Sequence, residues 1–101
     1  MPNVEAPELA LIRSILAAHV PSAEVRAFGS RVRGIPKPYS DLDLLVHDAH
    51  PLSLRTKGEL IEAFQESDLP FRVDVVDWHR ATETFRSLIL EDSEIVQEGK
   101  L

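Results

Sequence analysis

A glycine-serine break at the end of one short strand, followed closely by two acidic residues at the start of another, is the feature that most constrains this chain. Gly29 and Ser30 interrupt the alternating segment 24–28, and after ten intervening residues Asp41 and Asp43 open an apolar run. Residues i and i+2 of a strand point to the same face, ~7 Å apart along the chain. The pattern therefore predicts a turn just upstream of two carboxylates that share one face of a strand.

Around this feature the chain alternates between helical and extended patterns. Apolar residues at helical spacing predict three helices, and alternating or continuous apolar runs predict three strands. In chain order these elements are helix 7–21, strand 24–28, strand 42–46, helix 53–67, strand 72–77 and helix 82–90. The order predicts a small α/β (α+β) domain over residues 1–101, with a mixed sheet and the helices packed on one face.

The remaining segments are shorter and less regular. Residues 30–33 are expected to form a helical turn closed by Gly34, and residues 35–39, which include two prolines, a loop. Residues 93–101 are compatible with a strand or a helix. Two helices carry apolar residues that we expect to face the core: Leu54, Leu60, Ile61 and Phe64 in one, and Phe85, Leu88 and Ile89 in the other.

Composition excludes several classes of protein. The 101 residues are 44% hydrophobic and 28% charged, which is typical of one compact domain. No apolar run approaches the ~18 residues of a membrane span, the N-terminus lacks the pattern of a secretory signal, and there is no cysteine. The net charge of −6 weighs against tight nucleic-acid binding, which depends on basic side chains. We expect a cytoplasmic protein with neither a membrane nor a nucleic acid as partner.

The Gly29-Ser30 turn is a candidate anion site. Glycine adopts backbone angles closed to other residues and lets a ligand approach the main chain. The amides of Ser30 and Arg31 would begin a short helix, whose N-terminus favours anions, and the Ser30 hydroxyl adds a donor. A plain turn or helix cap remains the alternative for this pair of residues taken alone.

A third carboxylate is expected on the last strand. Asp74 interrupts a run of valines and needs a compensating interaction there. Asp77 lies three residues later, so a strand points it to the opposite face, and we expect it at a solvated strand end. Asp41, Asp43 and Asp74 together would form a set of oxygen ligands for Mg²⁺, a hard cation that often accompanies substrate phosphates.

Other polar residues allow more than one interpretation. Arg31, Arg33 and Lys37 are close enough in sequence to steady phosphates, and solvated loop cations are an equally good interpretation of each. His47 and His50 form a His-x-x-His pair, for which two exposed side chains are a better interpretation than a metal site.

Taken together, these motifs are similar to those of a known superfamily. The segments Ala-Phe-Gly-Ser-Arg-Val-Arg-Gly, Tyr-Ser-Asp-Leu-Asp-Leu-Leu-Val and Arg-Val-Asp-Val-Val-Asp-Trp resemble the nucleotidyltransferases typified by DNA polymerase beta and kanamycin nucleotidyltransferase. The resemblance is strongest to the minimal nucleotidyltransferase (MNT) proteins, which are antitoxins encoded beside helical HEPN-domain partners. It covers about residues 8 to 98.

The resemblance implies a polymerase beta palm-like fold and a role for each motif. Gly29 and Ser30 would bind the triphosphate of ATP, Asp41 and Asp43 would be metal ligands for two Mg²⁺ ions, and Asp74 would be the third catalytic carboxylate. The implied reaction transfers AMP from ATP to a hydroxyl of the HEPN toxin, within a hetero-oligomer.

Two other functions stay open on the sequence alone. The chain could neutralise a HEPN partner as a stoichiometric, nucleotide-binding subunit without independent catalysis. Adenylylation of a small molecule is the third possibility, and the lack of room for an acceptor-binding domain in 101 residues disfavours it.

Overall fold

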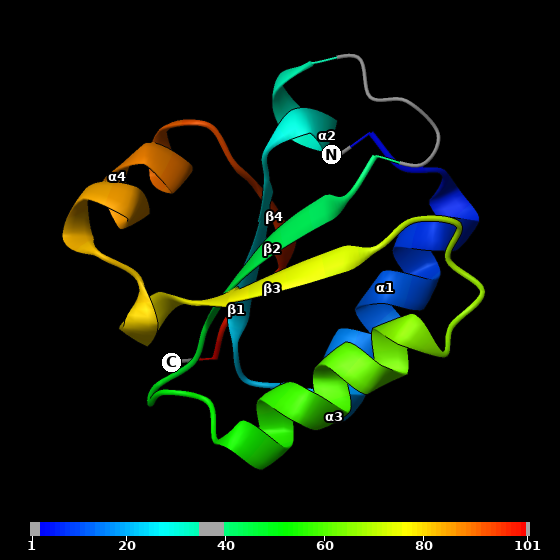
Figure 1. Ribbon diagram of the computed structural model, residues 1–101, viewed down its shortest axis with the longest axis horizontal. Coiled ribbons are helices and arrows are strands. Elements are labelled where there is room, and N and C mark those ends of the chain that lie inside the picture. Colours follow the sequence, from blue (N-terminus) through cyan, green and yellow to red (C-terminus); the bar gives the residue numbers. More distant parts are fainter. Residues whose placement is uncertain (1–2, 35–39, 101) are drawn as a thin grey trace.

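A four-stranded sheet organises the chain, and the computed structural model describes residues 3–34 and 40–100 of it (Figure 1). The elements in chain order are α1 (Ala6–His19), β1 (Glu24–Phe28), α2 (Ser30–Arg33), β2 (Leu42–His47), α3 (Leu54–Gln65), β3 (Val73–Asp77), a 3₁₀ turn (Trp78–Arg80), α4 (Glu83–Glu91) and β4 (Glu94–Gln97). The strand order is β3-β2-β1-β4. The β2–β3 pair is parallel and the other two pairs are antiparallel, so the predicted mixed sheet and fold class are confirmed.

The last segment, which the sequence left open, forms a strand. β4 pairs with β1 and supplies one edge of the sheet. The predicted helical turn after Gly29 is present as α2. The loop predicted at 35–39 lies outside the described residues.

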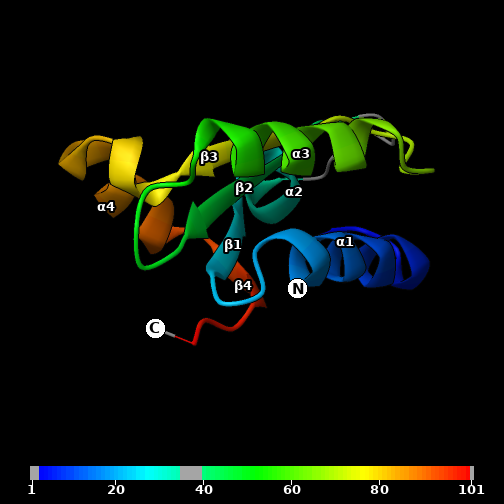
Figure 2. The same ribbon diagram turned by 90° about the horizontal axis from the view of Figure 1, so that it is seen from below.

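The main core lies between one face of the sheet and two helices. α1 and α3 pack against each other alongside that face (Figure 2). Alternate residues of the strands point into this layer, because side chains in a strand alternate between faces. The core residues of these elements are Leu9, Ile12 and Leu16 of α1, Leu60 and Phe64 of α3, and Val25, Ala27, Leu42, Leu44, Val46, Val73 and Val96 of the sheet.

α3 begins as expected, but only two of the four residues expected on its inner side, Leu60 and Phe64, are buried, and Ile61 is only partly buried. Ser53 caps the helix by accepting a hydrogen bond from the amide of Thr56 at 3.0 Å, an interaction worth about 1 kcal/mol. Leu54 was expected on the inner side, yet it is 86% exposed. It lies six residues before Leu60, and at 3.6 residues per turn this places it about 120° around the helix from the buried stripe.

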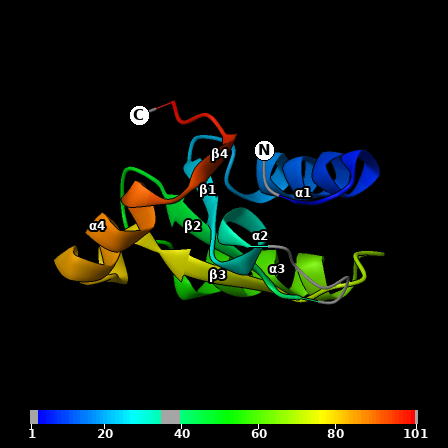
Figure 3. The same cartoon turned by 90° about the horizontal axis from the view of Figure 1, so that it is seen from above.

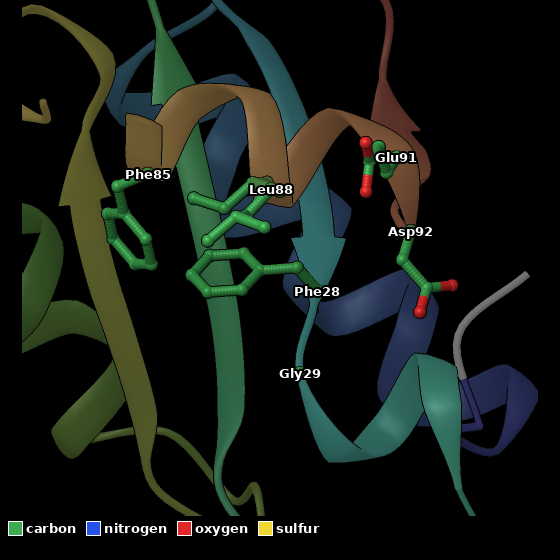
Figure 4. Close-up of a pocket in the computed structure, with 7 residues that line it drawn as sticks. Phe28, Gly29, Phe85, Leu88, Glu91 and Asp92 are labelled. Atoms are coloured by element: carbon green, nitrogen blue, oxygen red, sulfur yellow. The ribbon is translucent and has the colours of Figure 1, made fainter. Parts of the chain in front are cut away.

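α4 does not join the layer formed by α1 and α3. Phe28 alternates with the core residues of β1 and so faces the other side of the sheet, where its ring meets Phe85 of α4 at 6.0 Å in an edge-to-face contact. Figure 4 shows α4 crossing in front of β1 and β2 on this side. The expectation that all helices pack on one face is wrong for α4. Of its three residues expected to face inward, only Ile89 is buried, whereas Phe85 and Leu88 are 40% and 59% exposed.

Asp77 is buried and not solvated, contrary to the sequence-based expectation. The residue is 2% exposed, and its carboxylate accepts hydrogen bonds from the amides of Leu52 and His79, at 2.9 and 3.0 Å. Arg80 lies 3.5 Å away as an ion-pair partner. The segment before α3 and the 3₁₀ turn fold over the end of β3, and Asp77 ties the two together.

We therefore expect Asp77→Asn to destabilise the fold. The asparagine side chain has one acceptor oxygen in place of two, and it has no charge opposite Arg80. The backbone amide of Leu52 or that of His79 therefore loses its hydrogen-bond partner, at a cost of roughly 1–3 kcal/mol. The free energy of unfolding in urea measures this loss. Asp68→Asn, at an exposed position, is the matched control, and equal stability of the two variants would contradict the assignment.

Candidate active site

The face of the sheet opposite the main core carries three carboxylates. Asp43 on β2 and Asp74 on β3 are direct partners in the parallel register. Leu42 and Leu44, on either side of Asp43, point into the core, so Asp43 faces away from it. Asp41 lies two residues before Asp43 and on the same side. It shares an ion-pair partner, Arg72, with Asp74. The structure thus gathers the three acidic residues that the sequence grouped, and it places Asp77 on the opposite face.

Gly29 joins the turn after β1 directly to this acidic group. Its φ of 84° lies in the left-handed region that favours glycine. A Cβ at this position would collide with Oδ2 of Asp43. Phe28, the residue before it, is the register partner of Asp43 across β1 and β2. The glycine therefore allows the backbone of the turn to lie against the carboxylate of Asp43.

The two residues after Gly29 have different surroundings. Ser30 is exposed at the start of α2. Arg31 is 4% exposed, donates from Nε to the carbonyl of Ser40 at 2.8 Å and from Nη1 to that of Asn3 at 2.9 Å, and lies 4.0 Å from the ring centre of Phe71. Its guanidinium thus holds the segment that leads into Asp41.

The N-terminal segment reaches the same region. The amide of Asn3 donates to the carbonyl of Arg31 at 2.8 Å, and the chain passes close to α2 before entering α1 (Figure 3). Arg33 belongs to α2, but its side chain lies outside the described part of the structure, as does Lys37. Whether either contacts phosphate stays a prediction.

Arg72 is a member of the site that the sequence analysis missed. Its exposed guanidinium lies 3.2 Å from Oδ2 of Asp41 and 3.3 Å from Oδ1 of Asp74. The carboxylate of Asp41, and next that of Asp74, raises the pKa of Arg72. Arg72 stands two residues before Asp74 in the predicted strand 72–77, so strand alternation alone would have placed both side chains on one face.

The ionisation of Asp43 reflects this crowding. Burial raises the pKa of its carboxyl above the usual 3.8, and the negative charges of Asp74 and Asp41 raise it further, while Arg72 acts in the opposite direction. A divalent cation at this place would favour the ionised form. The donor chemistry suits Mg²⁺, which prefers carboxylate oxygens. Within residues 3–34 and 40–100, however, no three potential ligands converge closely enough to hold a metal ion, and Arg72 occupies the space between two of them.

The raised pKa predicts that Asp43→Asn stabilises the metal-free protein. Below pH 3.8 the wild-type carboxyl is protonated in both folded and unfolded states. As the pH rises through the higher folded-state pKa, the folded state must bear an unfavourable charge, so wild-type stability falls. Asparagine removes this penalty. We expect the variant to have a higher melting temperature than the wild type at pH 7 without metal. The gain in free energy of unfolding should be less than about 1 kcal/mol, because the carboxyl is partly solvated. The stability of the variant should also decline less than that of the wild type between pH 4 and 7. A lower melting temperature than that of the wild type would contradict the electrostatic account.

The histidine pair does not form a site. His47 stacks on Trp78, with the ring centres 4.3 Å apart and an angle of 13° between the planes, while His50 is exposed in the following loop. Burial, followed by the nearby His79, lowers the pKa of His47 from its usual 6.5. Arg86 lies over the same indole at 4.6 Å. The ring of Trp78 is therefore packed between side chains.

Among the residues that the structure describes, every helix is too short or too polar to cross a membrane.

Comparison with known proteins relates this chain to one family. Residues 9–100 match the family model of the nucleotidyltransferase domain. The chain is 46% identical over 96 residues to the probable protein adenylyltransferase MntA of Haemophilus influenzae, covering 95% of this chain and 84% of that protein.

Solved structures share the fold. A crystal structure of a toxin–antitoxin with AMP-PNP superposes with a TM-score of 0.75 at 25% identity, covering 90% of this chain and 73% of that one. A minimal nucleotidyltransferase superposes with a TM-score of 0.67 at 31% identity, covering 84% of this chain and 88% of that one.

Proposed function

Because the chain belongs to the nucleotidyltransferase domain family, we propose that it transfers AMP from ATP to a hydroxyl group of a protein. The hydroxyl oxygen attacks the α-phosphate, the bond between the α- and β-phosphates breaks, and pyrophosphate leaves. The similarity to a protein adenylyltransferase supports the protein acceptor. The similarity to a toxin–antitoxin bound to AMP-PNP supports ATP as the donor and a toxin as the partner.

One observation carries the proposal: Asp41, Asp43 and Asp74 share one face of the sheet, and the Gly29 turn lies against Asp43. Transfer of a nucleotidyl group requires that charge on the phosphates be neutralised and that an acceptor hydroxyl be activated. Carboxylates that bind a divalent cation beside an open backbone turn would meet both requirements.

We assign a role to each residue on this basis. Asp41, Asp43 and Asp74 would hold two Mg²⁺ ions, which stabilise the charge on the phosphates and lower the pKa of the attacking hydroxyl. The backbone of Gly29 and Ser30 and the Ser30 hydroxyl would bind the triphosphate. Asp74, at the β3 side of the group, would orient the acceptor hydroxyl or accept its proton.

The arginines of the site have separate roles. Arg31 acts through its bonds to Ser40 and Asn3 as a positioning residue for Asp41, and only its backbone amide would face the phosphates. Arg72 neutralises Asp41 and Asp74 in the absence of a metal ion. We assign no contact to Arg33 beyond its predicted approach to phosphate.

The proposed partner is a helical HEPN-domain toxin encoded nearby, in a hetero-oligomer in the cytoplasm. AMP transferred to a hydroxyl of the toxin would add charge and bulk at the modified side chain and so silence it. The acidic balance of the chain, −6, leaves little attraction for nucleic acid.

Incubation with labelled ATP, Mg²⁺ and the neighbour-encoded protein tests the proposal. We expect label on the partner, dependent on Mg²⁺ and abolished by chelation. Absence of label with an active, folded partner would contradict the enzymatic proposal. If the partner is nevertheless neutralised in cells by a variant without Asp41 and Asp43, the chain acts as a stoichiometric inhibitor.

A further inference from the structure

An apolar cavity opens beside the acidic group, on the same face of the sheet. Its volume is about 460 Å³, and its walls come from the end of β1 and from α4. Phe28 and Gly29 line one side, and Phe85 and Leu88 line the other (Figure 4). Ile89, Glu91 and Asp92 complete the lining. We refer to it as the Phe28–α4 cavity.

The Phe28–α4 cavity is continuous with the turn proposed to bind phosphate. Gly29 lines the cavity, and a Cβ on this residue would also touch Asp43. Phe28 is the register partner of Asp43, and adjacent strands are ~5 Å apart. Phe28, Asp43 and Asp74 therefore follow one another across three neighbouring strands on one face. A ligand with its phosphates at Gly29 can extend directly over the ring of Phe28.

The residues that line the cavity suit the base of a nucleotide better than its phosphates. Phe28 and Phe85 meet edge to face, and with Leu88 they offer apolar surface to a flat ring, as sites that stack bases do. Two acidic residues, Glu91 and Asp92, also line the cavity. Carboxylates repel phosphate and accept hydrogen bonds from amino groups or ribose hydroxyls. The triphosphate is thus disfavoured inside the cavity, and a base that carries an amino group is favoured.

We propose that the Phe28–α4 cavity binds the adenine base of ATP, an inference that rests on the proposed function. The triphosphate then lies at the Gly29 turn and the base lies under α4. The nucleotide occupies the β1 side of the face, so the acceptor hydroxyl must approach from the side of β3, where Asp74 stands. Phe85 and Leu88, which α4 leaves exposed on the sheet side opposite the main core, become contacts to the base.

Calorimetric titration of the protein with a non-hydrolysable ATP analogue and Mg²⁺ tests this proposal. Phe85→Ala and Leu88→Ser should each weaken binding of the analogue about tenfold, the effect expected for loss of a base-stacking contact. Their affinity for inorganic tripolyphosphate, which has no base, should stay within about twofold of that of the wild type. Leu54→Ser, which alters an exposed leucine on α3, is the matched control and should leave both affinities unchanged.

Three results would overturn the proposal: unchanged affinity for the analogue in both α4 variants, equal weakening of analogue and tripolyphosphate, or no binding of the analogue by the wild type. If the α4 variants bind the analogue normally but show a raised KM for the protein acceptor, the cavity holds the acceptor instead. Failure of the proposed function looks different: the wild type would bind the analogue and lose affinity in the α4 variants, yet transfer no label to any partner.

Discussion

Replacement of both Asp41 and Asp43 by asparagine is expected to lower the rate of AMP transfer at least about 1000-fold. Carboxylate ligands place and charge-balance metal ions whose stabilisation of the transition state is worth several kcal/mol, and each 1.36 kcal/mol corresponds to a factor of ten in rate. The initial rate of label transfer from ATP to the partner protein measures this effect. Single variants at either position should fall between the wild type and the double variant.

Stability separates this effect from unfolding. The Asp43 change alone should raise the melting temperature of the metal-free protein, because it removes a partly buried charge beside two others. A variant that is more stable and yet inactive has lost catalysis and kept its fold. Asp68→Asn serves as the control with unchanged activity. Transfer by the double variant at more than a tenth of the wild-type rate would contradict the assigned role of the carboxylates.

Gly29→Ala is expected to have the second largest effect, on both stability and transfer. The substitution places a side chain at a φ of 84° and drives its Cβ into Oδ2 of Asp43. The strained backbone should cost roughly 1–3 kcal/mol of stability. Displacement of Asp43 by ~1 Å should reduce transfer about 100-fold. Urea denaturation and the label-transfer rate measure the two effects.

Gly34→Ala is the matched control at the other end of α2. Gly34 has a φ of −130°, and the nearest atom that a methyl group on this residue would meet is the carbonyl oxygen of Ser30, at 3.8 Å. Alanine fits there without strain, so stability should change by less than about 0.5 kcal/mol. Equal effects of the two glycine substitutions would show that the turn tolerates a side chain and would contradict its close approach to Asp43.

The parts of the site that local chain geometry decides were predictable from sequence. The two-residue spacing of Asp41 and Asp43 places them on one face whatever surrounds the strand. The three-residue spacing of Asp74 and Asp77 separates them in the same way. The sequence did not show that β2 and β3 pair in parallel with Asp43 opposite Asp74, because register is set by the packing of whole elements.

The parts that depend on tertiary packing were missed. Arg31 follows the glycine turn and was a candidate phosphate ligand, yet its side chain is buried against Phe71 and held by backbone carbonyls. Asp77 was expected in solvent, and the segment before α3 covers it. The position of α4 on the second face also depends on long-range packing. An apolar stripe indicates that a helix packs against the sheet, but it does not indicate which face of the sheet the helix covers.

Crystals of the protein grown with Mn²⁺ and a non-hydrolysable ATP analogue give the most direct test of the central claim. Anomalous scattering locates Mn²⁺, which accepts the same oxygen ligands as Mg²⁺. We predict manganese peaks within coordination distance of Asp41, Asp43 and Asp74, with Arg72 displaced from between Asp41 and Asp74. Manganese bound elsewhere, or an analogue bound with no metal at these three carboxylates, would contradict the account.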